Sequence, residues 1–282
     1  MSNQPAHIDM DVNGVRLRCH DWGGSGEPIL LTHGTGMHAS LLGSIATALT
    51  AIGQVFSYDR RGHGDSSHDP DAQYNWEVEV EDLAGVIARL GLGKVRALGH
   101  SAGATVIGSL AAVEPGRFAR VMLVEPVLIE SGQSPRASSS DMLERTRRRR
   151  RVFDSPAAMF ANFENKPPFD TWRREILREY CATGASANAQ GEWELKCPPE
   201  IEARFYETAM AFDGLARLLK CEVPMMVLFG TRDEESTGAR YAKRLRAELK
   251  KARILSIPDT GHFLPLEQPG TVARLALEFF AE

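Results

Sequence analysis

The sequence lacks any apolar run near the length of about 20 residues that crosses a bilayer. It also lacks an excess of basic charge, since 33 Lys and Arg stand against 37 Asp and Glu, for a formal net charge of −4. Because nucleic-acid binding needs a basic surface, we expect neither a membrane nor a nucleic acid as partner. The first residues contain neither the basic start nor the apolar stretch of a secretory signal, so a cytoplasmic location is expected.

Motifs for metals and cofactors are also missing. The four cysteines are scattered without a CxxC pair, and free thiols are expected. There is no His-x-x-x-His pair and no cluster of Cys and His. The segment HGTG falls short of a dinucleotide fingerprint, and LGLGK lacks the phosphate-loop pattern. We therefore predict no metal and no cofactor, and the oligomeric state stays open.

What the sequence does contain is an alternation of short apolar runs with helical patterns. Alternating residues around Asn13-Gly14 predict a hairpin, because both turn positions tolerate positive φ. Continuous apolar runs such as PILLT and RVMLVEP are typical of strands buried on both faces. Strands that alternate with helices predict an α/β fold with a mostly parallel sheet and helices on both faces.

The alternation stops between residues 127 and 222, where the chain is helical, charged and without a convincing buried strand. We expect residues 1–126 and 223–282 to form the core, and residues 127–222 to form an inserted helical lid. The aromatic residues of this stretch favour a substrate with an apolar portion. Its basic run, Arg145 to Arg151, is interpreted as a solvated helix face. A minority interpretation turns one or two of these arginines inward, to bind a substrate carboxylate.

Ser101 is the candidate nucleophile. It stands in GHSAG, a Gly-x-Ser-x-Gly pattern at the end of a predicted strand and the start of a predicted helix. Gly99 and Gly103 remove the Cβ atoms that would clash in such a sharp turn. The helix that begins at Ala102 points its free N–H groups at the same place.

A serine hydroxyl needs a base to activate it and a carboxylate to orient that base. His262 follows the last predicted strand, and Asp233 follows the strand before it. Because the C-terminal ends of parallel strands share one edge of the sheet, Ser101, Asp233 and His262 are predicted to meet there. Glu125, at the end of the strand MLVEP, is the alternative acid.

Together these motifs resemble the α/β-hydrolase family. LLTHGTG is similar to its oxyanion loop, GHSAG to its nucleophile elbow, GTRD to its acid turn and GHFLPLEQP to its histidine loop, all in the family's order. The resemblance implies an oxyanion hole formed by the backbone N–H groups of Thr35 and Ala102. The chain departs from the pattern after Asp233, where Glu234 and Glu235 are further rival carboxylates.

We also predict roles for four other residues near these motifs. His33 is expected to shape the oxyanion loop through hydrogen bonds rather than to transfer protons. Gly36, His38 and His100 are possible pocket residues. The side chain of His100 is expected to point away from its neighbour in the elbow.

The predicted activity is that of a serine hydrolase acting on a small-molecule substrate. It would cleave a small to medium carboxylic ester or lactone through an acyl-enzyme on Ser101. The same resemblance leaves open a carbon–carbon bond hydrolase of ring-fission products and a cofactor-free haloperoxidase. A small-molecule receptor that uses the pocket without catalysis is a further alternative.

Overall fold

The computed structural model describes residues 4–130, 137–232, 237–249 and 251–282. In this part of the chain, eight strands form a sheet in the order β1-β2-β4-β3-β5-β6-β10-β11. The strands are β1 (Ala6–Val12), β2 (Val15–Gly23), β3 (Pro28–Thr32), β4 (Gln54–Tyr58), β5 (Val95–His100), β6 (Phe118–Val124), β10 (Met225–Gly230) and β11 (Ala252–Ile257). From β4 to β11 neighbouring strands are parallel, which confirms the mostly parallel sheet.

The predicted hairpin joins β1 and β2 at one edge of the sheet. The two strands pair antiparallel, with Val12 opposite Val15. Asn13 and Gly14 form the turn with φ values of 47° and 77°, the left-handed conformation that this dipeptide tolerates. The sequence prediction is therefore confirmed here.

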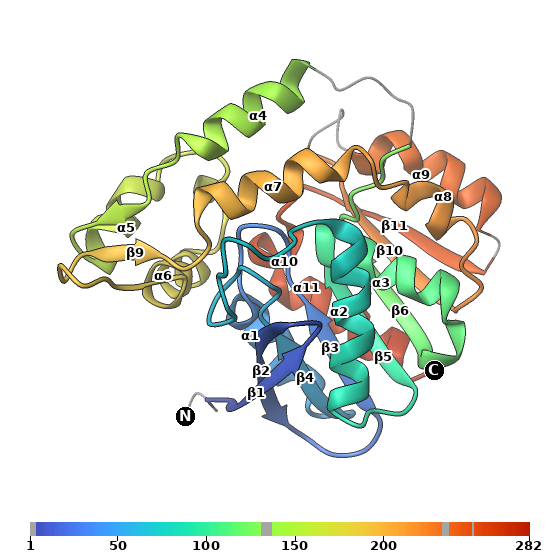
Figure 1. Ribbon diagram of the computed structural model, residues 1–282. Helices are drawn as coiled ribbons and strands as arrows, with labels where there is room; N and C mark the ends of the chain where they lie inside the picture. Colours follow the sequence, from blue (N-terminus) through green and yellow to red (C-terminus); the bar gives the residue numbers. More distant parts are fainter. Residues whose placement is uncertain (1–3, 131–136, 233–236, 250) are drawn as a thin grey trace.

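Helices cover both faces of the sheet (Figure 1). One face carries α1 (Gly43–Leu49) and α11 (Pro269–Phe280), which pack on each other. The other face carries α2 (Trp76–Arg89), α3 (Ala102–Val113), α8 (Gly214–Leu218) and α9 (Thr237–Glu248). Short helical turns at Ala39–Leu42 (η1), Pro115–Arg117 (η2) and Leu264–Glu267 (α10) complete this part of the chain.

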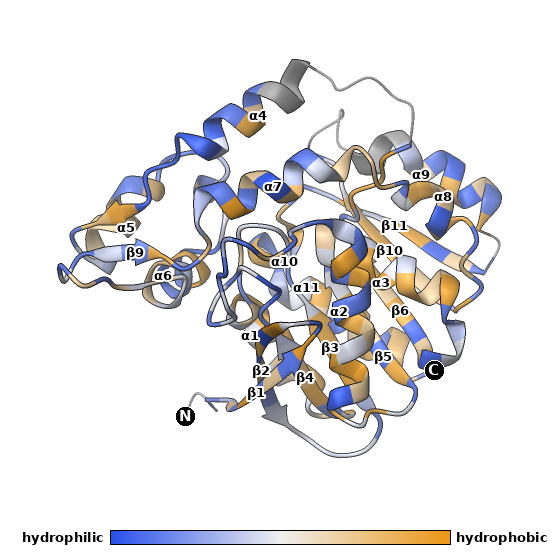
Figure 2. Ribbon diagram, in the orientation of Figure 1, coloured by the Kyte–Doolittle hydropathy of each residue, from blue (hydrophilic) through white to orange (hydrophobic). Residues whose placement is uncertain are grey.

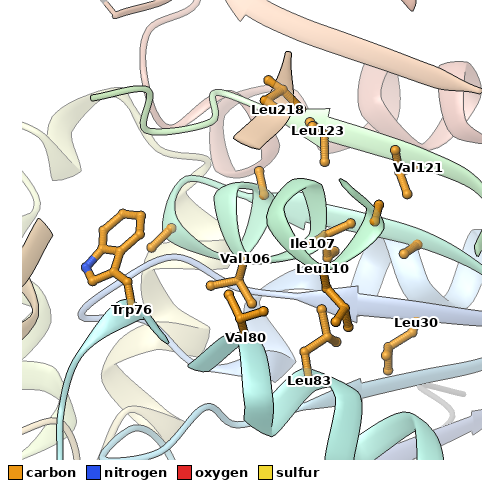
Figure 3. Close-up of a cluster of buried hydrophobic side chains, with 14 of the residues drawn as sticks. Leu30, Trp76, Val80, Leu83, Val106, Ile107, Leu110, Val121, Leu123 and Leu218 are labelled. Atoms are coloured by element: carbon orange, nitrogen blue, oxygen red, sulfur yellow. The ribbon is translucent and has the colours of Figure 1, made fainter. Parts of the chain in front are cut away.

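The α3 helix packs on the sheet with α2 and α8 beside it, and its sides are apolar. Figure 3 shows Val106, Ile107 and Leu110 of α3 among side chains of the neighbouring helix and strands. All three are fully buried or nearly so. Burying an aliphatic side chain of this size stabilises the fold by about 1.5–3 kcal/mol. This packing holds the first turn of α3, and with it Ser101, against the end of the sheet.

The segment between β6 and β10 contributes no described strand to this sheet. It contains α4 (Ala137–Arg147), β7 (Val152–Phe153), α5 (Pro156–Phe163), η3 (Phe169–Thr171), α6 (Arg174–Thr183), β8 (Ala185–Ala187), β9 (Trp193–Leu195), α7 (Pro199–Ala209) and α8. Figure 1 shows α4, α5, α6 and β9 extending to one side of the sheet. Figure 2 shows that α4 is largely hydrophilic, whereas the strands of the core are largely hydrophobic.

One expectation for this segment is wrong. It was predicted to hold no convincing buried strand, yet β7, β9 and β8 form a small antiparallel sheet in that order. Phe153 and Leu195 of this sheet are buried. Strands of two or three residues are too short to show an alternating pattern, so no sequence pattern predicts them.

The expectation of free thiols is confirmed for all four cysteines, which are buried and unpaired. Among the described helices, none combines the length and the apolar character of a membrane span.

Candidate active site

Ser101 occupies a strained turn between β5 and α3. Its φ of 55° and ψ of −123° lie outside the regions that a serine normally adopts. A Cβ atom on Gly103 would lie 2.5 Å from the carbonyl oxygen of His33, and one on Gly99 would lie 2.6 Å from Cα of Ala104. These contacts give the steric reason for both glycines. The turn is fixed further because the N–H of Ser101 donates to the carbonyl of Val124 at 2.9 Å.

The structure brings His262 to Ser101. Oγ of Ser101 lies 2.9 Å from Nε2 of His262, although the two residues are 161 positions apart. The carbonyl of His262 accepts a hydrogen bond from Nε2 of His100 at 2.8 Å, which anchors the histidine loop to the end of β5. The His262 side chain is 37% exposed. The serine and the imidazole therefore stand in the geometry of a nucleophile and its base, at the edge predicted from the sequence.

The described carboxylate beside His262 is that of Glu125. Its Oε2 lies 3.6 Å from Nδ1 of His262, and its other oxygen accepts the N–H of Gly230. Glu125 is 1% exposed and has a φ of 50°, directly after β6. Asp233, the acid predicted from the sequence, lies outside the described residues, as do Glu234 and Glu235.

The loop after β3 supplies the remaining polar groups. A Cβ atom on Gly34 would lie 3.0 Å from Cβ of Ser101, so this loop lies directly against the nucleophile. Neither the N–H of Thr35 nor that of Ala102 has a hydrogen-bond acceptor among the described residues. Both N–H groups are therefore free for a substrate oxygen, the property that an oxyanion hole requires.

Two histidines hold this loop. The ring of His33 bonds through Nδ1 to the carbonyl of Gly34 at 2.8 Å, and its Nε2 accepts the N–H of Arg60 at 3.0 Å. Burial, reinforced by the charge of Arg60, lowers the pKa of His33 to about 3, so the ring is neutral at pH 7. The N–H of Gly36 donates to Nε2 of His63 at 3.0 Å. The expected loop-shaping role of His33 is thus confirmed.

A cavity of about 520 Å³ opens beside these groups. It is bounded by the loop after β3, the residue after His262, and side chains of the segment between β6 and β10. Its lining consists of Thr35, Gly36, Met37, Asp141, Met142, Arg145, Thr146, Arg149, Pro167, Pro168, Phe169, Trp172, Tyr180, Glu202, Tyr206 and Phe263. A second hollow, of about 460 Å³, lies by the starts of β10 and β11, at the opposite edge of the sheet.

Of the possible pocket residues, only Gly36 belongs to this lining. His38 is 3% exposed and stacks on Tyr180, with ring centroids 6.0 Å apart. His100 is fully buried and bonded to His262, as described above. Burial lowers the pKa of His38 to about 4 and that of His100 to about 3. Neither ring lines the cavity. His38 packs against the lining residue Tyr180, and His100 anchors the histidine loop.

Glu202 occupies the cavity wall next to Gly36. A Cβ atom on Gly36 would lie 2.5 Å from Oε1 of Glu202, and Gly36 also has a φ of 76°, so only glycine fits there. Arg149 donates to Oε2 of Glu202 at 2.6 Å, and the hydroxyl of Tyr206 lies 3.2 Å from Oε1. Arg149 also donates to the hydroxyl oxygen of Tyr180. Apart from Gly36, no sequence pattern predicts this network.

The basic run is mostly paired with acids of its own segment. Arg147 pairs with Glu207, and Arg151 with Glu194. The side chains of Arg147 and Arg151 are about half exposed, as expected for a solvated face, whereas Arg149 turns inward to Glu202. In the described part of the chain, no group of three or more His, Cys, Asp or Glu side chains is arranged to hold a metal ion.

Comparison with known proteins places this geometry in a family. The profile described as "Alpha/beta hydrolase family" matches residues 29–275. The chain is 32% identical to N-formylmaleamate deformylase of Pseudomonas putida, over 94% of this chain and 92% of that one. It is 28% identical to a non-heme haloperoxidase of Rhodococcus erythropolis, over 95% and 96% of the two chains. The crystal structure of E-2-(acetamidomethylene)succinate hydrolase superimposes with a TM-score of 0.85 over 99% of this chain and all of that chain, at 20% identity.

Proposed function

Because the chain belongs to the alpha/beta hydrolase family, we propose that it is a serine hydrolase that cleaves small to medium carboxylic esters or lactones with an apolar portion. The observation that carries the proposal is the 2.9 Å separation between Oγ of Ser101 and Nε2 of His262. The cavity beside them has apolar walls from Met37, Phe169 and Phe263, which suit the apolar portion of a substrate.

The reaction follows from the positions of these groups. His262 removes the hydroxyl proton of Ser101 as Oγ attacks the carbonyl carbon. The N–H groups of Thr35 and Ala102 donate to the oxyanion that forms, and each such donor is commonly worth about 3 kcal/mol. His262 then passes the proton to the leaving alcohol. A water molecule, deprotonated by His262, releases the acid from Ser101.

We propose Glu125 as the acid of this site, instead of Asp233, which the sequence motifs predict. Among the described carboxylates, Glu125 is the one next to Nδ1 of His262, and one of its oxygens remains without a hydrogen-bond partner. A buried carboxylate at that nitrogen keeps the proton on Nδ1, so that Nε2 is free to accept the proton of Ser101.

We also propose that residues 127–222 act as a lid on a core of residues 1–126 and 223–282. Twelve of the cavity-lining residues come from the segment of residues 127–222, whereas Ser101, Glu125 and His262 come from the core. In this division the catalytic groups lie at the edge of the sheet in the core, and the lid selects the substrate.

The test is a panel of p-nitrophenyl esters of rising chain length, assayed with the wild-type protein and with Ser101→Ala. We expect the wild type to turn over these esters and the rate to fall about 10³-fold or more in the variant. Circular dichroism of the variant checks that it is folded. Equal rates in the two proteins would contradict the proposal.

A second candidate is hydrolysis of a carbon–nitrogen bond. The relative from Pseudomonas putida, 32% identical, is named a deformylase. The same groups would serve, because His262 can protonate a leaving nitrogen as it protonates a leaving oxygen. Comparing kcat/KM for matched esters and N-formyl amides separates the two candidates, and a higher value for the amides would favour the second.

A further inference from the structure

The cavity beside Ser101 contains buried hydrogen-bond donors that have no acceptor. Nε1 of Trp172 and Oγ1 of Thr35 lack a hydrogen-bond partner within the described residues, although Trp172 is only 6% exposed and Thr35 only 8%. Both residues line the cavity. Buried indole N–H groups and hydroxyls are nearly always paired in native proteins. Two residues of the cavity lining therefore hold donors that the acceptor atoms of a ligand would satisfy.

Tyr180 adds a third donor. Its hydroxyl oxygen accepts a hydrogen bond from Arg149, which leaves its own hydrogen available. No described acceptor takes that hydrogen, and Tyr180 also lines the cavity. Burial raises the pKa of Tyr180 to about 12, so the hydroxyl keeps its proton at neutral pH. The unpaired groups of Thr35, Trp172 and Tyr180 are therefore hydrogen-bond donors.

The charges of the wall point the same way. The charge of Arg149 is matched by Glu202, which it contacts at 2.6 Å. Arg145 lines the cavity, is exposed, and forms no ion pair with any described residue. Asp141 lies four residues earlier on α4 and is exposed at the mouth of the cavity, but it does not pair with Arg145. Arg145 is therefore the cation of the wall that is available to a carboxylate, and Asp141 is an opposing charge on the same helix.

We propose that the substrate carries a carboxylate, bound in this cavity by Arg145, the indole N–H of Trp172 and the hydroxyl of Tyr180. A carboxylate offers two acceptor oxygens and a negative charge, which match a guanidinium and two neutral donors. This inference rests on the proposed function, because it names the substrate class of the same site. The apolar walls described above then hold the hydrocarbon between the carboxylate and the scissile carbonyl.

The three groups proposed to bind the carboxylate come from separate elements that line the cavity. Arg145 is in the last turn of α4, Trp172 directly follows η3, and Tyr180 is in α6. Their convergence depends on the fold of this segment, in which α4 packs against α7 (Figure 1). A carboxylate held there would therefore also bind α4 to the rest of the segment.

The kinetic test compares monomethyl with dimethyl esters of succinate, glutarate and adipate. The two members of each pair differ only in one free carboxylate. We expect the monomethyl ester to have a kcat/KM about tenfold higher or more for at least one chain length, since hydrogen bonds to a charged group are strong. Arg145→Gln should reduce that ratio about tenfold. Arg148→Gln is the matched control, because Arg148 is in the same run, exposed and paired with Glu144, and it should keep the ratio.

A binding test separates this inference from the proposed function. Calorimetry with Ser101→Ala measures the affinity for each monomethyl and dimethyl ester without turnover. Tighter binding of a monomethyl ester, weakened by Trp172→Phe and strengthened by Asp141→Asn, would support the carboxylate site even if the wild type hydrolysed no ester. Equal or tighter binding of the dimethyl esters throughout would overturn the inference, even if both kinds of ester were hydrolysed.

Discussion

Nδ1 of His262 lies 3.6 Å from Oε2 of Glu125, a buried oxygen that has no hydrogen-bond partner among the described residues. The other oxygen of Glu125 accepts a hydrogen bond from the N–H of Gly230, which fixes the position of the carboxylate. The side chain of His262 is more than one-third exposed, and a hydrogen bond to Oε2 would need a separation shorter by a few tenths of an ångström. Catalytic hydrogen bonds are often long in the absence of substrate and shorten when it binds.

The first prediction concerns this pair. Glu125→Gln keeps an oxygen for the N–H of Gly230 but loses the charge at His262, so the imidazole adopts the wrong tautomer. We expect kcat for the best ester to fall about 10³- to 10⁴-fold, with KM little changed. Asp233→Asn is the matched control and is expected to keep activity within about threefold of the wild type. A large loss in Asp233→Asn with full activity in Glu125→Gln would return the role to Asp233.

The second prediction concerns Gly103 in the turn after Ser101. A Cβ atom there would lie 2.5 Å from the carbonyl oxygen of His33 and 2.7 Å from that of Thr32. Because both contacts are with backbone, Gly103→Ala should destabilise the protein by about 1–3 kcal/mol, measured by urea unfolding. Gly116→Ala is the control, since no atom lies within 4 Å of its Cβ position. Equal unfolding midpoints for the two variants would show that the turn tolerates the methyl group.

The third prediction concerns acid stability. Burial lowers the pKa of His33 and His100 to about 3 and that of His38 to about 4, below the value of about 6.5 in the unfolded chain. Below pH 6.5 the unfolded state therefore binds protons that the folded state does not, and stability falls as pH falls. Each histidine contributes a slope of about 1.4 kcal/mol per pH unit in that range.

The corresponding measurement is the free energy of unfolding in urea between pH 8 and pH 5. These histidines add little slope near pH 8, and the slope should grow as the pH falls through about 6.5. In the His38→Gln variant the slope near pH 5.5 should be smaller by about 1.4 kcal/mol per pH unit, the contribution of one histidine. A stability that is flat from pH 7 to pH 5 would mean that the three rings are protonated as easily in the folded protein as in the unfolded chain.

Much of the core could be predicted from local patterns. The hairpin at Asn13-Gly14, the buried strands and the helix after Ser101 each have a signal of their own, in turn chemistry or in apolar periodicity. The meeting of Ser101 with His262 followed from a rule of topology, since the C-terminal ends of parallel strands share one edge.

The rest depended on side-chain directions that a linear sequence does not contain. Glu125 and Asp233 both follow strands that end at this edge, and the sequence cannot tell which carboxylate turns toward His262. The positive φ of Glu125 is a tertiary feature, with its N–H held by the carbonyl of Leu228 on β10. In the basic run, Arg149 differs from its neighbours only through its packing against Glu202 and Tyr180.

The most direct test of the account is labelling by a fluorophosphonate, which reacts with a serine only when a neighbouring base activates it. We predict that the wild-type protein takes up one equivalent, that peptide mapping places it on Ser101, and that folded Ser101→Ala and His262→Ala react at least about 10³-fold more slowly. A folded wild-type protein that remains unlabelled, or that is labelled at another residue, would contradict the claim that Ser101 and His262 form a reactive pair.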